Sequence, residues 1–259
     1  MMNVRFLLVD GLNLIRRVYA AHPGEDGPER VKGAIESSLG SLRRALRECE
    51  PTHAVVVFEG EGRSWRYESY PGYKAGRTPM PEALRSGLPG FEEAFLGDGV
   101  ASVSLPGVEA DDVIATLASK VALRGGRAVI LSTDKTFLQL LSDRVRVRDH
   151  FHQRELDRAF LIDKYGIEPG QLTDFLALCG DSTNNIKGVP GIGAKTAARL
   201  LEEFGTLERL VSASGSMKGK WGESLRRYVE ELRHAKTLVT LRTDLDLGLN
   251  LKSFRLSGR

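Results

Sequence analysis

The sequence predicts an α/β protein in which a mostly parallel sheet is flanked by helices, followed by a region of short helices. Short apolar runs at residues 5–9, 54–58 and 127–131 are separated by segments of helical length, a pattern typical of parallel strands joined by helices. From about residue 157 the pattern changes to short helical segments. We therefore expect a sheet domain over residues 1–156 and a helical region over residues 157–259.

Within the expected sheet domain, the elements follow one another in a regular order. Residues 12–21, 31–47 and 113–122 carry apolar side chains at helical spacing, whereas residues 137–141 predict a short helix. Residues 145–150 and 152–156 predict a further pair of strands. Residues 70–81 interleave aromatic, basic and proline residues, so they form neither a regular strand nor a long helix. We expect a surface excursion there, partly helical from Glu82 onward.

Acidic residues follow the predicted strands at the points where these strands end. The first strand runs into Asp10, the second is followed by Glu59 and the third by Asp134. Because the carboxyl ends of parallel strands meet at one edge of a sheet, we expect these side chains to converge. Clustered carboxylates repel one another, and a hard divalent cation such as Mg²⁺ or Mn²⁺ keeps them charged.

A second group of acids precedes the predicted helix at 113–122 and consists of Glu109, Asp111 and Asp112. We expect Asp111 and Asp112 to share a metal ion with Asp10. The alternative for any single position is an N-cap or turn role, because an Asp oxygen accepts the free amide hydrogens at a helix start. Six acids gathered in one place favour the metal site over six separate caps.

A glycine-rich turn over residues 188–193 lies between the predicted helices at 172–179 and 196–204. Such a turn exposes backbone N–H groups beside a positive helix N-terminus, which suits a DNA phosphate without reading a base. A dinucleotide-binding loop is disfavoured, because no strand precedes the glycines and the GxGxxG spacing is absent. A plain helical hairpin remains the structural alternative.

Composition excludes several classes of protein. The chain has 259 residues, a formal net charge of +3, 41% hydrophobic residues and two cysteines. No apolar run reaches the ~20 residues that a membrane span requires, and no export signal is apparent. Two cysteines are too few for a disulfide framework, so we expect a cytoplasmic protein, with no case for an oligomer. Basic residues outnumber acidic ones over 63–85 and 187–220, which favours a polyanionic partner.

Taken in order, the motifs resemble the bacterial 5′-nuclease, or flap endonuclease, family, which includes the nuclease domain of DNA polymerase I and free-standing members. The resemblance runs nearly end to end, and its motifs are LLVDG at 7–11, YKAGR at 73–77, PMP at 79–81, EADD at 109–112, STDK at 132–135, GDS at 180–182 and GVPGIGAKTA at 188–197. It implies a PIN-like nuclease core, an arch over about residues 70–97 and a helix-hairpin-helix-type DNA-binding region.

The resemblance also implies roles for matching residues in catalysis and metal binding. Asp10, Glu59, Glu109, Asp111 and Asp112 stand where the family binds its first metal, although Glu59 replaces the usual Asp. Asp134 and Asp181 stand where the second site begins. Lys74 and Arg77 would approach the scissile phosphate, so that Lys74, Arg77 and Asp111 are the expected catalytic residues.

The remaining implied roles concern DNA and potassium. Arg17 matches a basic position after the first strand, and Tyr73 would stack on a base. Main-chain carbonyls around Leu178, Cys179, Lys187, Val189 and Ile192 would hold K⁺. Backbone groups of the glycine turn and the helix after it would meet a phosphate, and the residues concerned are Gly191, Ile192, Gly193, Ala194, Lys195 and Thr196.

Two positions depart from the family pattern of two-metal nucleases. Thr136 and Asn184 each stand where a second-site Asp is usual, and the loss of charge weakens Mg²⁺ binding there. The sequence therefore predicts a metal-dependent nuclease acting on branched or 5′-flap DNA. The alternatives are a branched-DNA-binding protein whose catalysis is weakened, and a ribonuclease of the related small metal-nuclease class, which the arch and glycine turn disfavour.

Overall fold

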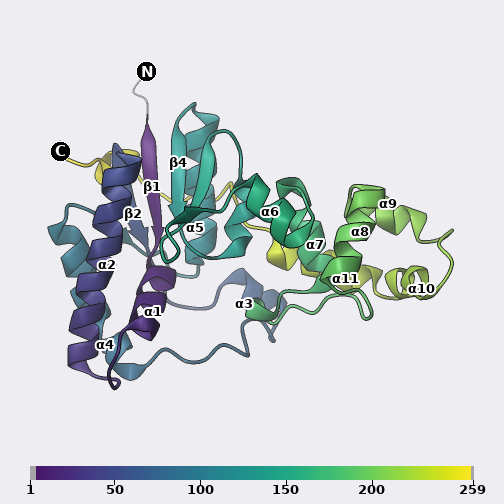
Figure 1. Ribbon diagram of the computed structural model, residues 1–259, viewed down its shortest axis with the longest axis horizontal. Coiled ribbons are helices and arrows are strands. Elements are labelled where there is room, and N and C mark those ends of the chain that lie inside the picture. The colour runs from purple at the N-terminus through teal and green to yellow at the C-terminus, as the bar shows by residue number, and fades with distance from the viewer. Residues whose placement is uncertain (1–3, 258–259) are drawn as a thin grey trace. The chain divides into compact units, whose positions relative to one another are not determined.

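The computed structural model describes residues 4–257, in two compact units. The sheet unit contains residues 4–64, 78–155 and 242–257 of the described chain, and the helical unit contains residues 65–77 and 156–241. Figure 1 follows the chain through both units. Residues 242–257 belong to the sheet unit, whereas the sequence prediction placed them with the helices.

The sheet unit is built on six strands in the order β3-β2-β1-β4-β5-β6, confirming the α/β class. The first five strands run parallel to one another, and β6 runs antiparallel to β5. The strands are β1 (Arg5–Asp10), β2 (His53–Val57), β3 (Ala101–Val103), β4 (Arg127–Leu131), β5 (Val145–Asp149) and β6 (Arg154–Glu155). Strand β3 has three partly buried residues and no alternation, so the sequence pattern did not reveal it.

Helices cover both faces of the sheet. One face packs against α1 (Gly11–Ala21), α2 (Pro28–Cys49) and α4 (Glu82–Gly97), and the buried cluster between them includes Leu7, Val9 and Val56. Helix α5 (Ala110–Leu123) packs against β1, β2 and β4, and the Phe254 ring of η4 (Leu251–Phe254) stacks on Phe6 at 5.9 Å. The 3₁₀ helix η1 (Lys135–Leu140) follows β4, where a short helix was expected at 137–141.

The helical unit contains short helices, as the sequence indicated. These are α3 (Trp65–Ser69), α6 (Arg158–Tyr165), η2 (Pro169–Gln171), α7 (Leu172–Cys179), η3 (Ser182–Asn184), α8 (Ala194–Phe204), α9 (Leu207–Ala213), α10 (Lys220–Arg227) and α11 (Val229–Val239). Helix α7 contacts both α8 and α11. The buried Arg66 of α3 donates hydrogen bonds to the main-chain carbonyls of Leu238 and Thr240, at 2.8 and 2.9 Å. Among residues 4–257, no helix is long and apolar enough to span a membrane.

Candidate functional site

The carboxyl end of the sheet carries the acids that the sequence placed there. Asp10 is the last residue of β1, and β2 and β4 are followed by Glu59 and Asp134. Strands β1, β2 and β4 are parallel neighbours, so the three acids leave the sheet at the same edge. The observed topology therefore places the ends of these three strands at one edge of the sheet, and a shared metal site there stays a prediction.

Asp10 is the most buried of these three acids, with 6% of its surface exposed. Its Oδ1 accepts a hydrogen bond from the Asn13 amide at 3.1 Å and its Oδ2 accepts one from the Ser132 hydroxyl at 2.8 Å. Burial raises the pKa of the Asp10 carboxyl to about 7, the carboxylates of Asp134 and Glu59 add to the rise, and the two hydrogen bonds oppose it. Asp10 thus caps α1, and it also sits in a carboxylate cluster where its charge is poorly stabilised.

Helix α5 brings the second acidic group through its first turn. Glu109 occupies the N-cap position and is 3% exposed, whereas Asp111 and Asp112 lie in the first turn, where negative charge is favourable to the helix dipole. The Ala110 amide at the start of this helix donates to Glu59 at 3.0 Å, and the Arg242 amide donates to Asp112 at 3.0 Å. The structure therefore joins Glu59 directly to the beginning of α5.

As these side chains lie, no three His, Cys, Asp or Glu residues within 4–257 are arranged so that they could hold a metal ion. Several of the acids accept hydrogen bonds from main-chain amides instead, and mutual repulsion favours carboxylates that turn to such donors. The donor set nevertheless consists of hard oxygens, which suit Mg²⁺ or Mn²⁺, and the raised pKa of Asp10 marks a place where a cation would be stabilised.

Asp134, the third strand-end acid, is hydrogen-bonded by one of the two residues that depart from the family pattern. The backbone amide and the hydroxyl of Thr136 both donate to Asp134 Oδ1, each at 2.8 Å. Asp134 thereby caps η1. The hydroxyl at position 136 stabilises the Asp134 carboxylate with a neutral donor, where a second carboxylate would repel it.

The helical unit shows the same arrangement around Asp181, which is 1% exposed. The Asn184 amide nitrogen donates to Asp181 Oδ2 at 2.7 Å, and the Asn184 amide oxygen accepts from Arg77 Nη2 at 2.7 Å. The Lys74 backbone amide donates to the Asn184 carbonyl at 2.9 Å. Asn184 thus connects three residues that the sequence singled out, a role that no sequence pattern had indicated.

Tyr73 and Lys74 are both buried, although side chains that contact a nucleic acid need exposed surface. Tyr73 is 3% exposed and its ring meets Tyr67 edge-on, with centroids 5.2 Å apart, whereas the Lys74 ammonium lies 5.0 Å from the Tyr73 ring centroid. Lys74 itself is 7% exposed and has a φ of 56°, in the left-handed region. In this conformation Tyr73 offers little surface for stacking on a base.

The glycine turn over 188–193 leads directly into α8. Gly191 has a φ of +84°, which favours glycine, and Gly193 is the N-cap of α8 without a side-chain cap. The first amides of α8 thus lack a capping side chain, and Gly191, Gly193, Ala194 and Lys195 are exposed. This part of the turn has the properties that a phosphate site needs.

The other side of the turn is packed against α7. A Cβ atom on Gly188 would lie 2.4 Å from the backbone of Cys179, so the glycine turn and the end of α7 approach each other closely. The Val189 amide donates to the Leu178 carbonyl at 2.9 Å, and the Ile192 amide donates to the Val189 carbonyl at 3.0 Å. These carbonyls belong to the group proposed for K⁺, and each carbonyl oxygen keeps a second lone pair.

Arg17, the basic residue expected to contact DNA, is exposed on α1. It lies near His150, whose two ring nitrogens are buried without a hydrogen-bond partner. Burial lowers the pKa of His150 to about 4, Asp149 opposes this shift, and the charges of Arg17 and His152 add to it. No sequence signal marked His150, because a lone histidine after a strand has many possible roles.

Known families and proteins match this chain over nearly its whole length. The family model of the N-terminal, resolvase-like domain of 5′-3′ exonucleases matches residues 5–166, and that of the C-terminal SAM fold matches residues 167–259. Flap endonuclease Xni of Aeromonas salmonicida is 46% identical over 252 residues, covering 96% of this chain and 95% of that protein. Flap endonuclease Xni of Cronobacter sakazakii is 43% identical and covers 99% and 100%, respectively.

Solved structures agree with these matches. A bacteriophage T5 D15 flap endonuclease complex with DNA and metal ions has a TM-score of 0.74 and 26% identity, covering 91% of this chain and 88% of that one. The T5 D15 protein co-crystallised with metal ions gives a TM-score of 0.73 at 25% identity, with the same coverage. A parallel sheet with an acidic carboxyl edge, together with a helical unit, defines the resolvase-like class of nucleases. Within that class, the chain belongs to the 5′-3′ exonuclease family.

Proposed function

We propose that this protein is a metal-dependent, structure-specific nuclease that hydrolyses phosphodiester bonds at 5′ flaps in DNA. The flap endonucleases that match it nearly end to end support the substrate. The observation that carries the chemistry is the set of acids at the carboxyl edge of β1, β2 and β4, with the buried Asp10 among them. Cytoplasmic location and a monomeric state accompany this proposal, and in the described chain neither Cys49 nor Cys179 forms a disulfide, which is in keeping with it.

The proposed metal ligands come from the sheet unit and are Asp10, Glu59, Glu109, Asp111, Asp112 and Asp134, with Asp181 in the helical unit. Bound Mg²⁺ or Mn²⁺ supplies charge neutralisation at the phosphate and activation of the attacking water. Asp111 lies at the half-exposed end of this group, on the first turn of α5, from which its carboxylate can turn toward a substrate.

Lys74 and Arg77 are proposed to stabilise the negative charge that develops on the phosphate. Asn184 holds both, through the backbone of Lys74 and the guanidinium of Arg77. Exposed Arg17, the backbone amides of 191–196 and the side chain of Lys195 would contact the DNA backbone, with K⁺ held by main-chain carbonyls behind the glycine turn. Tyr73 would join them once its ring is uncovered.

A catalytically weakened DNA-binding protein is the second candidate. The observation that favours it is the pair of neutral donors, Thr136 and Asn184, bonded to Asp134 and Asp181. Each takes up a carboxylate oxygen that a second metal would use, so resting occupancy of a second metal is weak. The intact positions Lys74 and Arg77 favour the active enzyme.

Cleavage of a 5′-labelled flap duplex with Mg²⁺, with Mn²⁺ and with EDTA tests the proposal. We expect metal-dependent cleavage near the junction that Asp111→Ala abolishes, whereas flap-DNA binding stays measurable. Asp163→Ala, which removes an exposed acid of α6, is the matched control and keeps full activity. Binding without cleavage in either metal would establish the second candidate, and Mg²⁺-dependent cleavage by Asp111→Ala would refute the site assignment.

The salt dependence of binding tests the DNA contacts separately. Each phosphate contact contributes about 0.9 to the slope of log K against log salt concentration. Lys195→Ala should therefore reduce the magnitude of the slope by about 1 and weaken binding to all DNA sequences alike. A slope unchanged by this substitution would remove Lys195 from the binding surface.

A further inference from the structure

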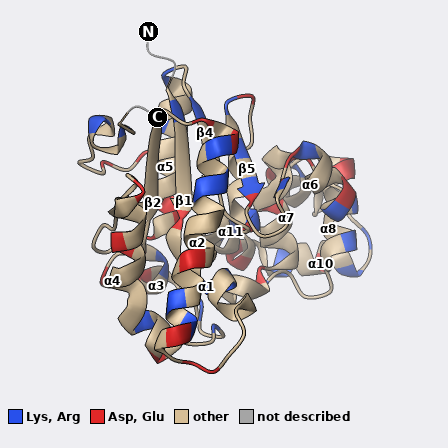
Figure 2. Cartoon of the chain, turned by 60° about the vertical axis from the view of Figure 1, so that its left-hand side comes forward, with Lys and Arg blue, Asp and Glu red and all other residues tan. Residues whose placement is uncertain are grey.

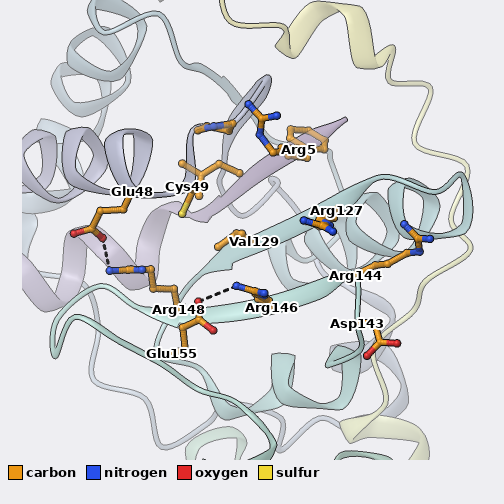
Figure 3. A pocket seen from close by; sticks show the side chains of 14 residues that line it. Arg5, Glu48, Cys49, Arg127, Val129, Asp143, Arg144, Arg146, Arg148 and Glu155 are labelled. Carbon is orange, nitrogen blue, oxygen red and sulfur yellow. Dashed lines mark hydrogen bonds and ion pairs between the residues drawn. The ribbon is translucent and has the colours of Figure 1, made fainter. Parts of the chain in front are cut away.

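The sheet unit contains a basic cavity that extends from the amino ends of β1 and β4 along β5. The cavity has a volume of about 180 Å³. Arginines from β1, β4 and β5, or from the residues just before these strands, surround it (Figure 3). Its basic residues are Arg5, Arg127, Arg144, Arg146 and Arg148, and its acidic ones are Glu48, Asp143 and Glu155. Neither the nuclease site nor the proposed DNA contacts use any of them.

Strand register explains why the arginines gather. Arg5 of β1 is the register partner of Arg127 of β4, and Ala128 donates its amide to the Arg144 carbonyl just before β5. Register partners in a parallel sheet present their side chains on the same face, and adjacent strands lie about 4.8 Å apart. Three guanidinium groups therefore start from one row across the sheet, on the face that α2 covers only as far as Cys49.

Ion pairs neutralise two of the five arginines. The positive charge of the other three, at the strand starts, exceeds the negative charge of the remaining lining. Arg146 pairs with Glu155 at 3.5 Å and Arg148 pairs with Glu48, as the dashed lines in Figure 3 mark. Figure 2 shows, in blue, that basic residues occur at β5. Asp143 is the remaining acid of the lining, so the three arginines at the strand starts face one carboxylate.

Main-chain carbonyls hold two of these three arginines in place without neutralising them. Arg5 donates from Nε to the Glu50 carbonyl at 2.7 Å, and Arg144 donates from Nη1 to the Gly125 carbonyl at 2.7 Å. A guanidinium oriented in this way keeps its other N–H groups for a ligand, and its forked geometry suits phosphate oxygens. Like charges on register partners repel one another, so an anion bound among these arginines would be stabilised.

Apolar atoms form the rest of the lining. Leu7, Val129, Cys49 and Pro51 contribute to it, and Val129 and Cys49 are half-buried there. The lining thus suits a ligand with an anionic end and an apolar part. At about 180 Å³ the cavity is smaller than the ~300 Å³ at which pockets for drug-sized ligands begin, so it takes only part of such a ligand, and the rest lies at its rim. A stiff duplex cannot enter a concave site of this size, whereas one nucleotide can place its phosphate and sugar in it.

We propose that this cavity binds a nucleoside monophosphate, with its phosphate on Arg5, Arg127 and Arg144 and its base over Val129 and Cys49. Arg5 and Asp10 stand at opposite ends of β1, five residue steps or about 17 Å apart at the usual strand rise. One mononucleotide cannot reach both ends. The site is therefore separate from the acidic edge, and it does not depend on the proposed nuclease function.

Calorimetric titration of the full chain with dAMP in EDTA tests the proposal without any contribution from cleavage. Arg127→Gln and Arg144→Gln should each weaken binding about tenfold or more, since each removes a charged hydrogen-bond donor to phosphate. Arg124→Gln is the matched control, because this exposed arginine lies three residues from Arg127 and outside the cavity lining, and it should bind as the parent does. Thermal melts confirm that all variants fold.

The same titration with adenosine and with inorganic phosphate tests the two halves of the ligand separately. Both should bind more weakly than dAMP, because each supplies one half of the ligand. The proposal is overturned if dAMP does not bind, if Arg127→Gln and Arg144→Gln bind it as the parent does, or if inorganic phosphate binds as tightly as dAMP. Displacement of dAMP by short duplex DNA but not by dCMP would also overturn it, since the face would then be a duplex contact.

Discussion

The two ends of the sheet carry opposite charges on the same strands. Strand β1 begins at Arg5 and ends at Asp10, and β4 begins at Arg127 and is followed by Asp134. Because the strands are parallel, every amino end meets at one edge and every carboxyl end at the other. The topology thus gathers residues distant in sequence into a basic and an acidic edge, and the two edges suit ligands of opposite sign.

The edges differ in how their charges are stabilised. At the acidic edge Asp10 is buried and accepts neutral hydrogen bonds from Ser132 and Asn13. At the basic edge Arg127 and Arg144 are exposed to water, which screens their repulsion. Charge is therefore far more costly at the acidic edge, and disturbing the two edges should give effects of very different size.

The largest effect is expected from Asp10→Asn. In metal-free protein the folded state keeps the Asp10 proton up to a pH of about 7, whereas the unfolded chain releases it near the ordinary value of 3.8. Stability from this group is complete below pH 3.8 and is lost as pH rises through 7. The loss is at most about 4 kcal/mol, from about 1.36 kcal/mol for each pKa unit.

Urea unfolding in EDTA at pH 5 and pH 7.5, compared between parent and Asp10→Asn, measures this loss. The parent should lose more stability than the variant between the two values, and added Mg²⁺ should restore stability at pH 7.5 in the parent alone. An Asn at this position still accepts the Asn13 amide, so α1 remains capped. Equal pH dependence in both proteins would contradict the claim that the charge of Asp10 is costly at the acidic edge.

A smaller effect is expected from Thr136→Asp, which adds a carboxylate to the same edge. The substitution removes the hydroxyl that donates to Asp134 and places a like charge beside it. In EDTA we expect the free energy of unfolding to fall by about 1–3 kcal/mol. Thr136→Val, which removes the donor but adds no charge, is the matched control. Mg²⁺ should recover stability in the Asp variant beyond its effect on the Val variant, and equal recovery would contradict a metal site here.

The smallest effect belongs to the basic edge. Arg127→Gln relieves the repulsion from Arg5 across the β1–β4 pair, so in ligand-free protein at low salt it should stabilise the fold by about 0.2–1 kcal/mol. High salt screens this repulsion and should abolish the gain. Thermal unfolding at low and high salt, with Arg124→Gln as the control, measures it. A destabilising effect at low salt would mean that Arg127 is already neutralised in the folded protein.

The sequence predicted the acidic edge because each acid directly follows a recognisable strand, and parallel topology does the rest. It did not predict the basic edge, since an arginine at the start of a strand resembles any exposed residue until the register places Arg5 beside Arg127. The burial of Tyr73 could not be predicted from the sequence either, because it depends on packing against Tyr67 of α3. Arg66 bonds to carbonyls more than 170 residues away, at Leu238 and Thr240, and such pairings leave no local pattern.

Asn184 has a consequence for how the helical unit responds to its surroundings. Its side-chain bonds to Asp181 and Arg77 involve an amide, which carries no charge and does not titrate. The Lys74 amide bonds to the main-chain carbonyl of the same residue. A carboxylate at this position would repel Asp181 whenever divalent ions were withdrawn, loosening the segment that carries Lys74 and Arg77. With an amide, that segment has the same anchor whether metal is abundant or scarce. The shape presented to DNA is thereby uncoupled from the supply of metal.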